Sequence, residues 1–203
     1  MAPINSLAGY IFDYGGVLVG HQTDADQERL ASLAGIPKDR FFELYWTRRL
    51  DYDRGDLSRI EYWQALASSA GTWFGERTID ELAEADARSW MRFDPAMWEW
   101  IAELRRASKR VAMLSNMPRD MGEALRLRTD RLKAFDHVTL SYEVRATKPD
   151  AAAYEHCLEG LGMRPEETVF FDDSLANVRG AELLGMRAIQ FTNREDLLAR
   201  LKA

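Results

Sequence analysis

The sequence has little cysteine, no basic tract and no long apolar run. Of its 203 residues only Cys157 is a cysteine, so no disulfide can form within the chain, and a reducing compartment suits it. The net charge is −6 without a lysine-rich or arginine-rich stretch, which argues against nucleic acid or an anionic membrane as partner. No apolar stretch approaches the roughly 20 residues of a membrane span, and the first residues do not resemble a secretory signal. We therefore expect a cytoplasmic protein.

Short runs rich in apolar and β-branched residues predict five strands, and several of them are apolar throughout, as in strands buried on both faces of a parallel sheet. These runs are residues 9–13, 110–115, 137–140, 168–172 and 187–191. Between the later runs, helical patterns cover residues 119–135, 151–161 and 175–184. Strands that alternate with helices predict an α/β fold with a doubly wound, Rossmann-like parallel sheet. Cys157 lies within one of these helical patterns, so we expect a packed thiol.

Residues 24–90 show no convincing strand and have helical patterns instead, at residues 26–33, 38–49, 59–70 and 78–90. A helical insertion of this length after a first strand predicts a separate cap. We expect a core of residues 1–19 and 92–203 with a helical cap of residues 20–91.

All six tryptophans fall between Trp46 and Trp100, in the insertion or just after it. We expect these indoles to build a small helical core in the cap. The alternative is that one or two of them line a substrate pocket.

Three of the predicted strands end in a polar residue: Asp13, Ser115 and Asp172. In open α/β sheets, ligands bind beyond the carboxyl ends of the strands. Taken singly, Ser115 is equally typical of a helix cap, and the pair Asp172–Asp173 could cap the next helix. Their recurrence at successive strand ends predicts a functional site there.

Four short segments follow one another in a characteristic order. They are FDYGGVLV (12–19), LSN (114–116), KP (148–149) and FFDDSLAN (170–177). Together they resemble the ordered motifs of the haloacid dehalogenase-like hydrolase superfamily, and the insertion lies where that family carries its helical cap. The resemblance spans nearly the whole chain. It is greatest to the helical-cap branch, which includes epoxide hydrolase N-terminal domains and sugar-phosphate phosphatases.

The resemblance implies phosphoryl transfer through a covalent intermediate. Asp13 would attack phosphorus and form an aspartyl-phosphate that water then hydrolyses. Ser115 and Asn116 would bind the phosphoryl oxygens. Lys148 would serve both as a catalytic residue and as a fixed positive charge on the same oxygens. A solvated lysine before a proline is the alternative for Lys148 taken alone.

The resemblance also implies a Mg²⁺ cofactor. A cluster of carboxylates would repel a phosphate dianion, and a hard divalent cation with oxygen ligands removes that repulsion. Asp13, the backbone carbonyl of Gly15 and Asp173 would hold the metal. Asp172 would ligate it directly or through water.

Two further residues are candidate substrate contacts. Arg54 lies in DRGDLSRIEYW (53–63), which is similar to the cap segment of related phosphatases that dips towards the active site. His21 lies close behind the first motif. A surface arginine and a packed or solvated histidine are the alternative interpretations.

The sequence departs from the family at Gly15, where most of its phosphatases carry a second acid. We expect a Mg²⁺-dependent phosphatase that acts on a small phosphorylated metabolite, such as a sugar phosphate. One alternative is a metal-independent dehalogenase, against which the double acid Asp172–Asp173 argues. The other is a catalytically weak small-molecule binding module, which the loss of the acid at position 15 keeps open. The sequence leaves the substrate and the oligomeric state undecided.

Overall fold

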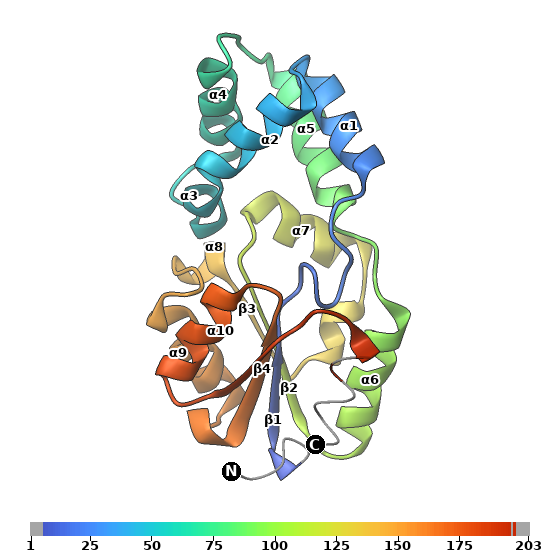
Figure 1. Cartoon of the computed structure of the whole chain (residues 1–203), viewed down its shortest axis with the longest axis vertical. Coiled ribbons are helices and arrows are strands. Elements are labelled where there is room, and N and C mark those ends of the chain that lie inside the picture. Colours follow the sequence, from blue (N-terminus) through green and yellow to red (C-terminus); the bar gives the residue numbers. More distant parts are fainter. Residues whose placement is uncertain (1–5, 196, 198–203) are drawn as a thin grey trace.

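A parallel sheet of five strands forms the centre of the protein, whose computed structural model describes residues 6–195 and 197. The strand order is β3-β2-β1-β4-β5, and every neighbouring pair is parallel (Figure 1). The strands are β1 (Gly9–Phe12), β2 (Arg110–Ser115), β3 (His137–Leu140), β4 (Thr168–Asp172) and β5 (Arg187–Gln190). All five predicted strands are confirmed, and only β1 and β5 end one residue earlier than expected.

Helices cover both faces of the sheet because alternate strand residues point to opposite sides. Tyr10 and Phe12 of β1 pack into the cluster formed with α6 (Pro95–Arg106) and α7 (Arg119–Arg128). Ile11 between them packs into the opposite cluster with α9 (Ala151–Leu161) and α10 (Leu175–Leu183). Figure 1 shows α6 on one side of the strands and α9 and α10 on the other. The predicted doubly wound α/β fold is confirmed.

Cys157 lies on the inner face of α9 and is fully buried. Burial raises the pKa of its thiol to about 12. The predicted packed thiol is confirmed, because a thiol with so high a pKa carries no thiolate at neutral pH.

The predicted helix over residues 119–135 is wrong in its second half. The helix α7 ends at Arg128, Thr129 is extended (φ −151°, ψ 147°), and a 3₁₀ turn follows at Arg131–Ala134. The Thr129 hydroxyl accepts a hydrogen bond from the backbone N of Arg131 at 3.2 Å. Such local bonds compete with the helical ladder, and here the break turns Phe135 into the core. Two further short elements are α8 (Ser141–Val144) and a 3₁₀ turn at Pro165–Glu167.

Residues 24–89 form five helices that stand above the carboxyl edge of the sheet (Figure 1). They are α1 (Asp24–Ala34), α2 (Lys38–Thr47), α3 (Arg49–Arg54), α4 (Arg59–Ser69) and α5 (Glu76–Ser89). They pack around a hydrophobic cluster of their own, separate from the two clusters on the sheet. The expected single helix over 38–49 is divided, because Arg48 leaves helical geometry (φ −123°, ψ 19°) and α3 begins beyond it. We call residues 24–89 the helical unit.

The tryptophans do not build the core of the helical unit together. Only Trp63 belongs to its buried cluster. Trp98 and Trp100 pack on the sheet instead, and the side chain of Trp73 is 73% exposed. The expectation of an indole-built core is wrong, because phenylalanine and tyrosine side chains supply most of its aromatic rings. The remaining two tryptophans line the cavity described below.

The two segments that connect the helical unit to the sheet run side by side. Val19 pairs with Phe93 in an antiparallel bridge, and the backbone N of Gly20 donates to the carbonyl of Arg92 at 3.0 Å. The two connections between the helical unit and the rest of the chain therefore lie next to each other. Of the helices within the described part of the chain, none has the length and apolar character to cross a membrane.

Trp63→Ala is expected to lower the free energy of unfolding by about 3–5 kcal/mol, because it removes a large, fully buried side chain and leaves a cavity. Chemical denaturation measures the change. Trp73→Ala is the matched control and should change the stability little, since its side chain is mostly in solvent. Equal effects of the two variants would contradict the packing described for the helical unit.

Candidate active site

Three adjacent strands bring polar side chains to one edge of the sheet. Asp13 follows β1, which lies between β2, ending in Ser115, and β4, ending in Asp172. The backbone N of Asp13 donates to the carbonyl of Phe171 at 2.8 Å, so the pairing of β1 with β4 continues up to this residue. The chain winds in opposite directions on either side of β1, and such switch points are where α/β proteins bind ligands.

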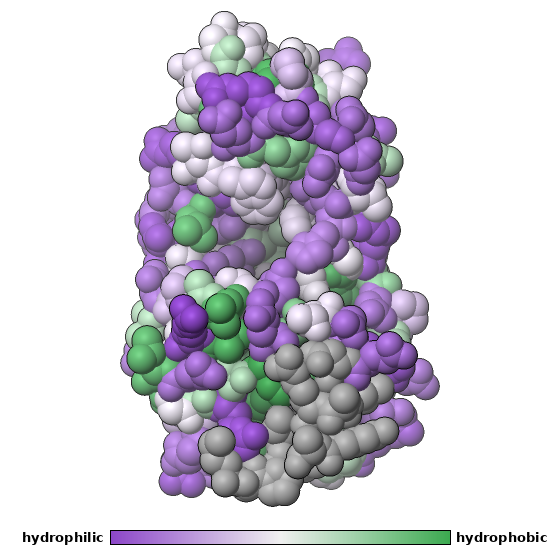
Figure 2. Space-filling model, viewed as in Figure 1, coloured by the Kyte–Doolittle hydropathy of each residue, from purple (hydrophilic) through white to green (hydrophobic). Residues whose placement is uncertain are grey.

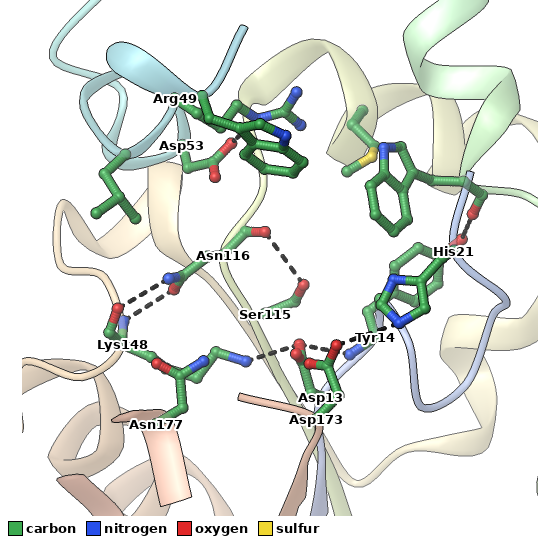
Figure 3. A pocket seen from close by; sticks show the side chains of 15 residues that line it. Asp13, Tyr14, His21, Arg49, Asp53, Ser115, Asn116, Lys148, Asp173 and Asn177 are labelled. Carbon is green, nitrogen blue, oxygen red and sulfur yellow. Dashed lines mark hydrogen bonds and ion pairs between the residues drawn. The ribbon is translucent and has the colours of Figure 1, made fainter. Parts of the chain in front are cut away.

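Lys148 bridges two carboxylates at this edge, and Figure 3 shows its contact with the first of them, Asp13. Its Nζ lies 2.7 Å from Asp13 Oδ1 and 2.7 Å from Asp172 Oδ2, and its side chain is buried. Burial raises the pKa of Asp13 well above its usual range, Asp172 adds to the shift, and Lys148 opposes it. Burial alone would lower the pKa of Lys148, but its two ion pairs outweigh this and raise it. The ammonium therefore stays charged between the two acids.

Asn116 fixes the backbone of Lys148. Its Oδ1 accepts from the backbone N of Lys148 at 2.8 Å, and its Nδ2 donates to the carbonyl of the same residue at 2.9 Å. Both ends of the amide are thus engaged by one residue from a distant loop. The side chain of Asn116 positions the lysine, and Asn116 also lines the cavity, so its expected contact with phosphate stays a prediction.

Asp172 is fully buried and surrounded by donors. Its Oδ1 accepts from the backbone N of Ser174 at 2.8 Å and from Asn177 Nδ2 at 3.0 Å. Its Oδ2 accepts from Asn177 Nδ2 at 3.1 Å and from Lys148. With both oxygens occupied in this way, Asp172 anchors Lys148 beneath the site.

Asp173 faces the cavity and contacts the turn after β1. His21 Nε2 lies 3.3 Å from Asp173 Oδ2. Gly16 has φ +71°, and a Cβ there would lie 2.6 Å from the same oxygen, so only glycine fits this close approach. Burial raises the pKa of Asp173, Asp172 adds to the shift, and His21 opposes it.

A cavity of about 500 Å³ lies between this edge and the helical unit. Figure 2 shows a recess at this level of a mostly polar face. Its lining includes most of the residues that the sequence singled out: Asp13, Gly15, His21, Ser115, Asn116, Lys148 and Asp173. Asp172 lies below the lining. Arg54 does not line the cavity, because its guanidinium is held by Asp56 at 2.9 Å and lies 3.4 Å from Thr147 Oγ1.

The side of the cavity formed by the helical unit carries a buried ionic group that sequence reasoning missed. Arg49 Nε donates to Asp53 Oδ1 at 2.7 Å, and Arg49 Nη1 donates to Asp86 Oδ2 at 2.9 Å. The Tyr45 hydroxyl donates to Asp86 Oδ1 at 2.7 Å and contacts Arg49. The i,i+4 spacing of Arg49 and Asp53 was a readable signal for one of these pairs. Asp86 is too far along the chain for such a signal.

The space beside Gly15 is taken by an aromatic ring. A Cβ at position 15 would lie 3.2 Å from Cζ3 of Trp90, so the indole packs directly on the glycine backbone. Trp90 ends the last helix of the helical unit and lines the cavity. The position at which the family's second acid would stand therefore borders an apolar wall.

The acidic residues of the site fit a hard divalent cation. Among the residues that the structure describes, Asp13, Asp172 and Asp173 are the one group of three potential ligands whose oxygens all lie within 4.8 Å of one another. Carboxylate oxygens are the donors that Mg²⁺ and Ca²⁺ prefer. Lys148 pairs with Asp13 and Asp172, and Asp173 adds a third carboxyl group beside them. A cation would balance the excess of negative charge.

Lys148→Ala is expected to lower the free energy of unfolding by about 3–5 kcal/mol in the presence of a chelator, because it leaves two buried carboxylates without their cation. Denaturant titration measures the change. Lys133→Ala, which removes an exposed ion pair with Asp130, is the control and should have little effect. Equal stabilities would mean that the carboxylates do not need the lysine charge.

Comparison with known proteins assigns the family. The family model for haloacid dehalogenase-like hydrolases matches residues 7–185. A phosphatase of Mycobacterium tuberculosis is 28% identical over 187 residues, 90% of this chain and 86% of the relative. A sesquiterpene phosphatase of Aspergillus oryzae is 28% identical over 186 residues, 90% and 89% of the two chains. The solved structure of a HAD-like family hydrolase from Porphyromonas gingivalis has the same fold, with a TM-score of 0.77, 24% identity and coverage of 97% and 98%. With Asp13, Lys148 and the two acids at the end of β4 gathered at its switch point, the chain belongs to the haloacid dehalogenase-like hydrolases.

Proposed function

We propose that the protein is a Mg²⁺-dependent phosphatase that hydrolyses a phosphate ester of a small organic molecule through an aspartyl-phosphate on Asp13. The observation that carries this proposal is the Asp13 carboxylate at the floor of the cavity, held by Lys148 at 2.7 Å. The phosphatase names of two relatives that match over most of their length support it.

The hydrogen bonds of Asp13 assign different roles to its two oxygens. Oδ1 accepts from the backbone N of Tyr14 at 2.6 Å and pairs with Lys148, which leaves Oδ2 to attack phosphorus. As the new bond forms, the bond from phosphorus to the leaving oxygen breaks, and the electron pair departs with that oxygen. Water then attacks the aspartyl-phosphate, releases inorganic phosphate and regenerates Asp13.

The phosphoryl oxygens need donors and positive charge more than they need further nucleophiles. The hydroxyl of Ser115 lies at the end of β2 and lines the cavity, where it would donate to one of these oxygens. Lys148 supplies the fixed charge, and Asn116 acts through Lys148 by holding its backbone. Asp172 acts in the same way by holding the ammonium.

Asp13, the carbonyl oxygen of Gly15 and Asp173 would hold Mg²⁺, and Asp172 would lie behind them. When bound, the cation neutralises charge on the transferred phosphoryl group and orients it. A glycine at position 15 still provides this ligand, because the carbonyl oxygen belongs to the backbone.

We also propose that residues 20–91 act as a cap over a core of residues 1–19 and 92–203. The side-by-side connections near residues 19–23 and 91–95 support two adjacent hinges. Polar contacts hold the two parts together: Ser141 Oγ donates to the carbonyl of Asp53 at 2.5 Å, and the Tyr52 hydroxyl donates to Asp120 at 2.5 Å. A cap closed in this way would exclude water while Asp13 reacts.

The other functions have weaker support. A dehalogenase has no use for the second and third carboxylates, which would repel a haloacid and a departing halide. A binding module has no need of a buried Asp13–Lys148–Asp172 chain, because ion pairs of this kind are costly to desolvate. These observations favour turnover of a phosphate ester.

Asp13→Asn is expected to lower kcat by on the order of 10³ or more, because the amide is not a nucleophile. Chelation of divalent cations should abolish turnover of the wild type, and added Mg²⁺ should restore it. Phosphate release from phenyl phosphate measures both effects. Asp39→Asn, an exposed change outside the cavity, is the control. Turnover that survives both the Asp13 substitution and chelation would contradict the mechanism.

Rates should fall steeply as the pKa of the leaving group rises, because no carboxylic acid stands at position 15 to protonate the departing oxygen. General acids are typically worth about 10²–10⁴ in rate, so alkyl phosphates should react slower than aryl phosphates by roughly this factor. Gly15→Asp should flatten this dependence in a plot of kcat/KM against leaving-group pKa.

Gly15→Ala is the control for that experiment, because any side chain at position 15 requires the Trp90 ring to move. The alanine variant should keep the steep dependence of the wild type. A wild-type enzyme that hydrolyses alkyl and aryl phosphates equally fast, with chemistry rate-limiting, would mean that another acid serves the site.

A further inference from the structure

Two large apolar side chains of the helical unit stand open to the cavity. Trp46, near the end of α2, is 55% exposed, and Leu50, in the first turn of α3, is 51% exposed. Both line the space above Asp13. Trp73 is more exposed still but lies outside the cavity lining, so location distinguishes Trp46 and Leu50. Exposed apolar side chains that gather in a cleft mark a binding surface.

Further apolar side chains complete the walls of the same cavity. Trp90 packs against Gly15. The hydroxyl of Tyr14 donates to the Trp90 carbonyl at 2.8 Å, and the Tyr14 ring forms part of the same wall. Met121 of α7 also lines the cavity. The cavity thus has a charged floor at the strand edge and walls that are mainly apolar, in which Arg49 and Asp53 form a buried ion pair.

The charged side chains of the helical unit that line the cavity, Arg49 and Asp53, pair with each other. The guanidinium of Arg49 donates to Asp53 and Asp86 and contacts Tyr45. A polyhydroxylated sugar would bury its hydroxyls against indole and leucine side chains, where unpaired hydroxyls are costly. An aromatic or other apolar group gains from the same surface, because it leaves water for apolar contacts.

We propose that the site takes aryl phosphates, in which the phosphate is esterified to a phenolic oxygen on an apolar aromatic group. This inference rests on the proposed phosphatase function and assigns its substrate class. The aromatic group would lie among Trp46, Leu50 and Trp90, with the phosphate on Asp13. Glycine at position 15 agrees with it, because a phenolate is stable enough to leave without a proton from the enzyme.

The reaction balances with water as the co-reactant. Asp13 forms a bond to phosphorus, the bond from phosphorus to the aryl oxygen breaks, and the aryl oxygen keeps the electron pair as a phenolate. The phenolate takes its proton from solvent. A water molecule then cleaves the aspartyl-phosphate, so that each turnover yields one phenol and one inorganic phosphate.

The test compares substrates at fixed Mg²⁺ with the whole protein. We expect kcat/KM to be higher for 2-naphthyl phosphate than for phenyl phosphate by roughly tenfold, since the leaving groups are of similar acidity and only the apolar surface grows. Trp46→Ala and Leu50→Ser should lower the ratio of kcat/KM for 2-naphthyl phosphate to that for acetyl phosphate by roughly tenfold or more, mainly through KM. Trp73→Ala should keep the wild-type ratio.

Each other result overturns the assignment in a distinct way. Faster turnover of farnesyl phosphate than of 2-naphthyl phosphate would mean an apolar but non-aromatic substrate. Faster turnover of ribose 5-phosphate, with ratios unchanged in Trp46→Ala and Leu50→Ser, would refute the apolar site but leave the phosphatase standing. Absence of turnover on every substrate, acetyl phosphate included, would refute the phosphatase itself. In that case, titration with phenylphosphonate and methylphosphonate decides whether the cavity prefers an aromatic ligand.

Discussion

The bridge from Lys148 to Asp13 and Asp172 is the interaction on which the site depends. Removing two carboxylates from water is unfavourable, and a single buried ammonium must compensate both. Neighbouring residues hold this bridge in place: Asn116 fixes the backbone of the lysine, and Ser174 and Asn177 at the start of α10 donate to Asp172. The consequence is a carboxylate at Asp13 that is fixed in direction and open on one side. Without Lys148, the same acids would lie at the sheet edge, but their side chains would not be held in place and their negative charge would not be balanced. Phosphoryl transfer requires both.

The turn after β1 joins the charged floor to the apolar walls. Gly16 lets the chain pass within contact distance of Asp173, and Gly15 lets Trp90 lie on the backbone. The first contact keeps an acid next to Asp13. The contact between Gly15 and Trp90 places an aromatic ring where most phosphatases of the family carry the carboxyl group that donates a proton. Two neighbouring glycines therefore divide the cavity into an end suited to a phosphate and an end suited to an apolar group.

Local patterns were sufficient for the sheet and for the residues at its edge. Buried parallel strands are continuous apolar runs, so the five strands were predicted to within one residue, and Asp13, Ser115 and Asp172 followed as their terminal polar residues. Helix ends were less well determined. Thr129 and Arg48 interrupt helical patterns through single backbone conformations, and periodicity does not record such interruptions. The same limit applies to Arg54, whose place in a motif-like segment did not reveal that Asp56 holds it outside the cavity.

The sequence by itself determined the fold class, the family resemblance and the chemical character of the floor, because these depend on runs of a few adjacent residues and on the ends of strands. Only the tertiary structure decided what stands opposite that floor. The pairing of Arg49 with Asp86 and the packing of Trp90 on Gly15 join segments that are distant along the chain. Such contacts arise from how the helical unit folds and rests on the sheet. Whether a tryptophan forms core, as Trp63 does, or cavity wall, as Trp46 does, is decided by that packing and not by the residues beside it.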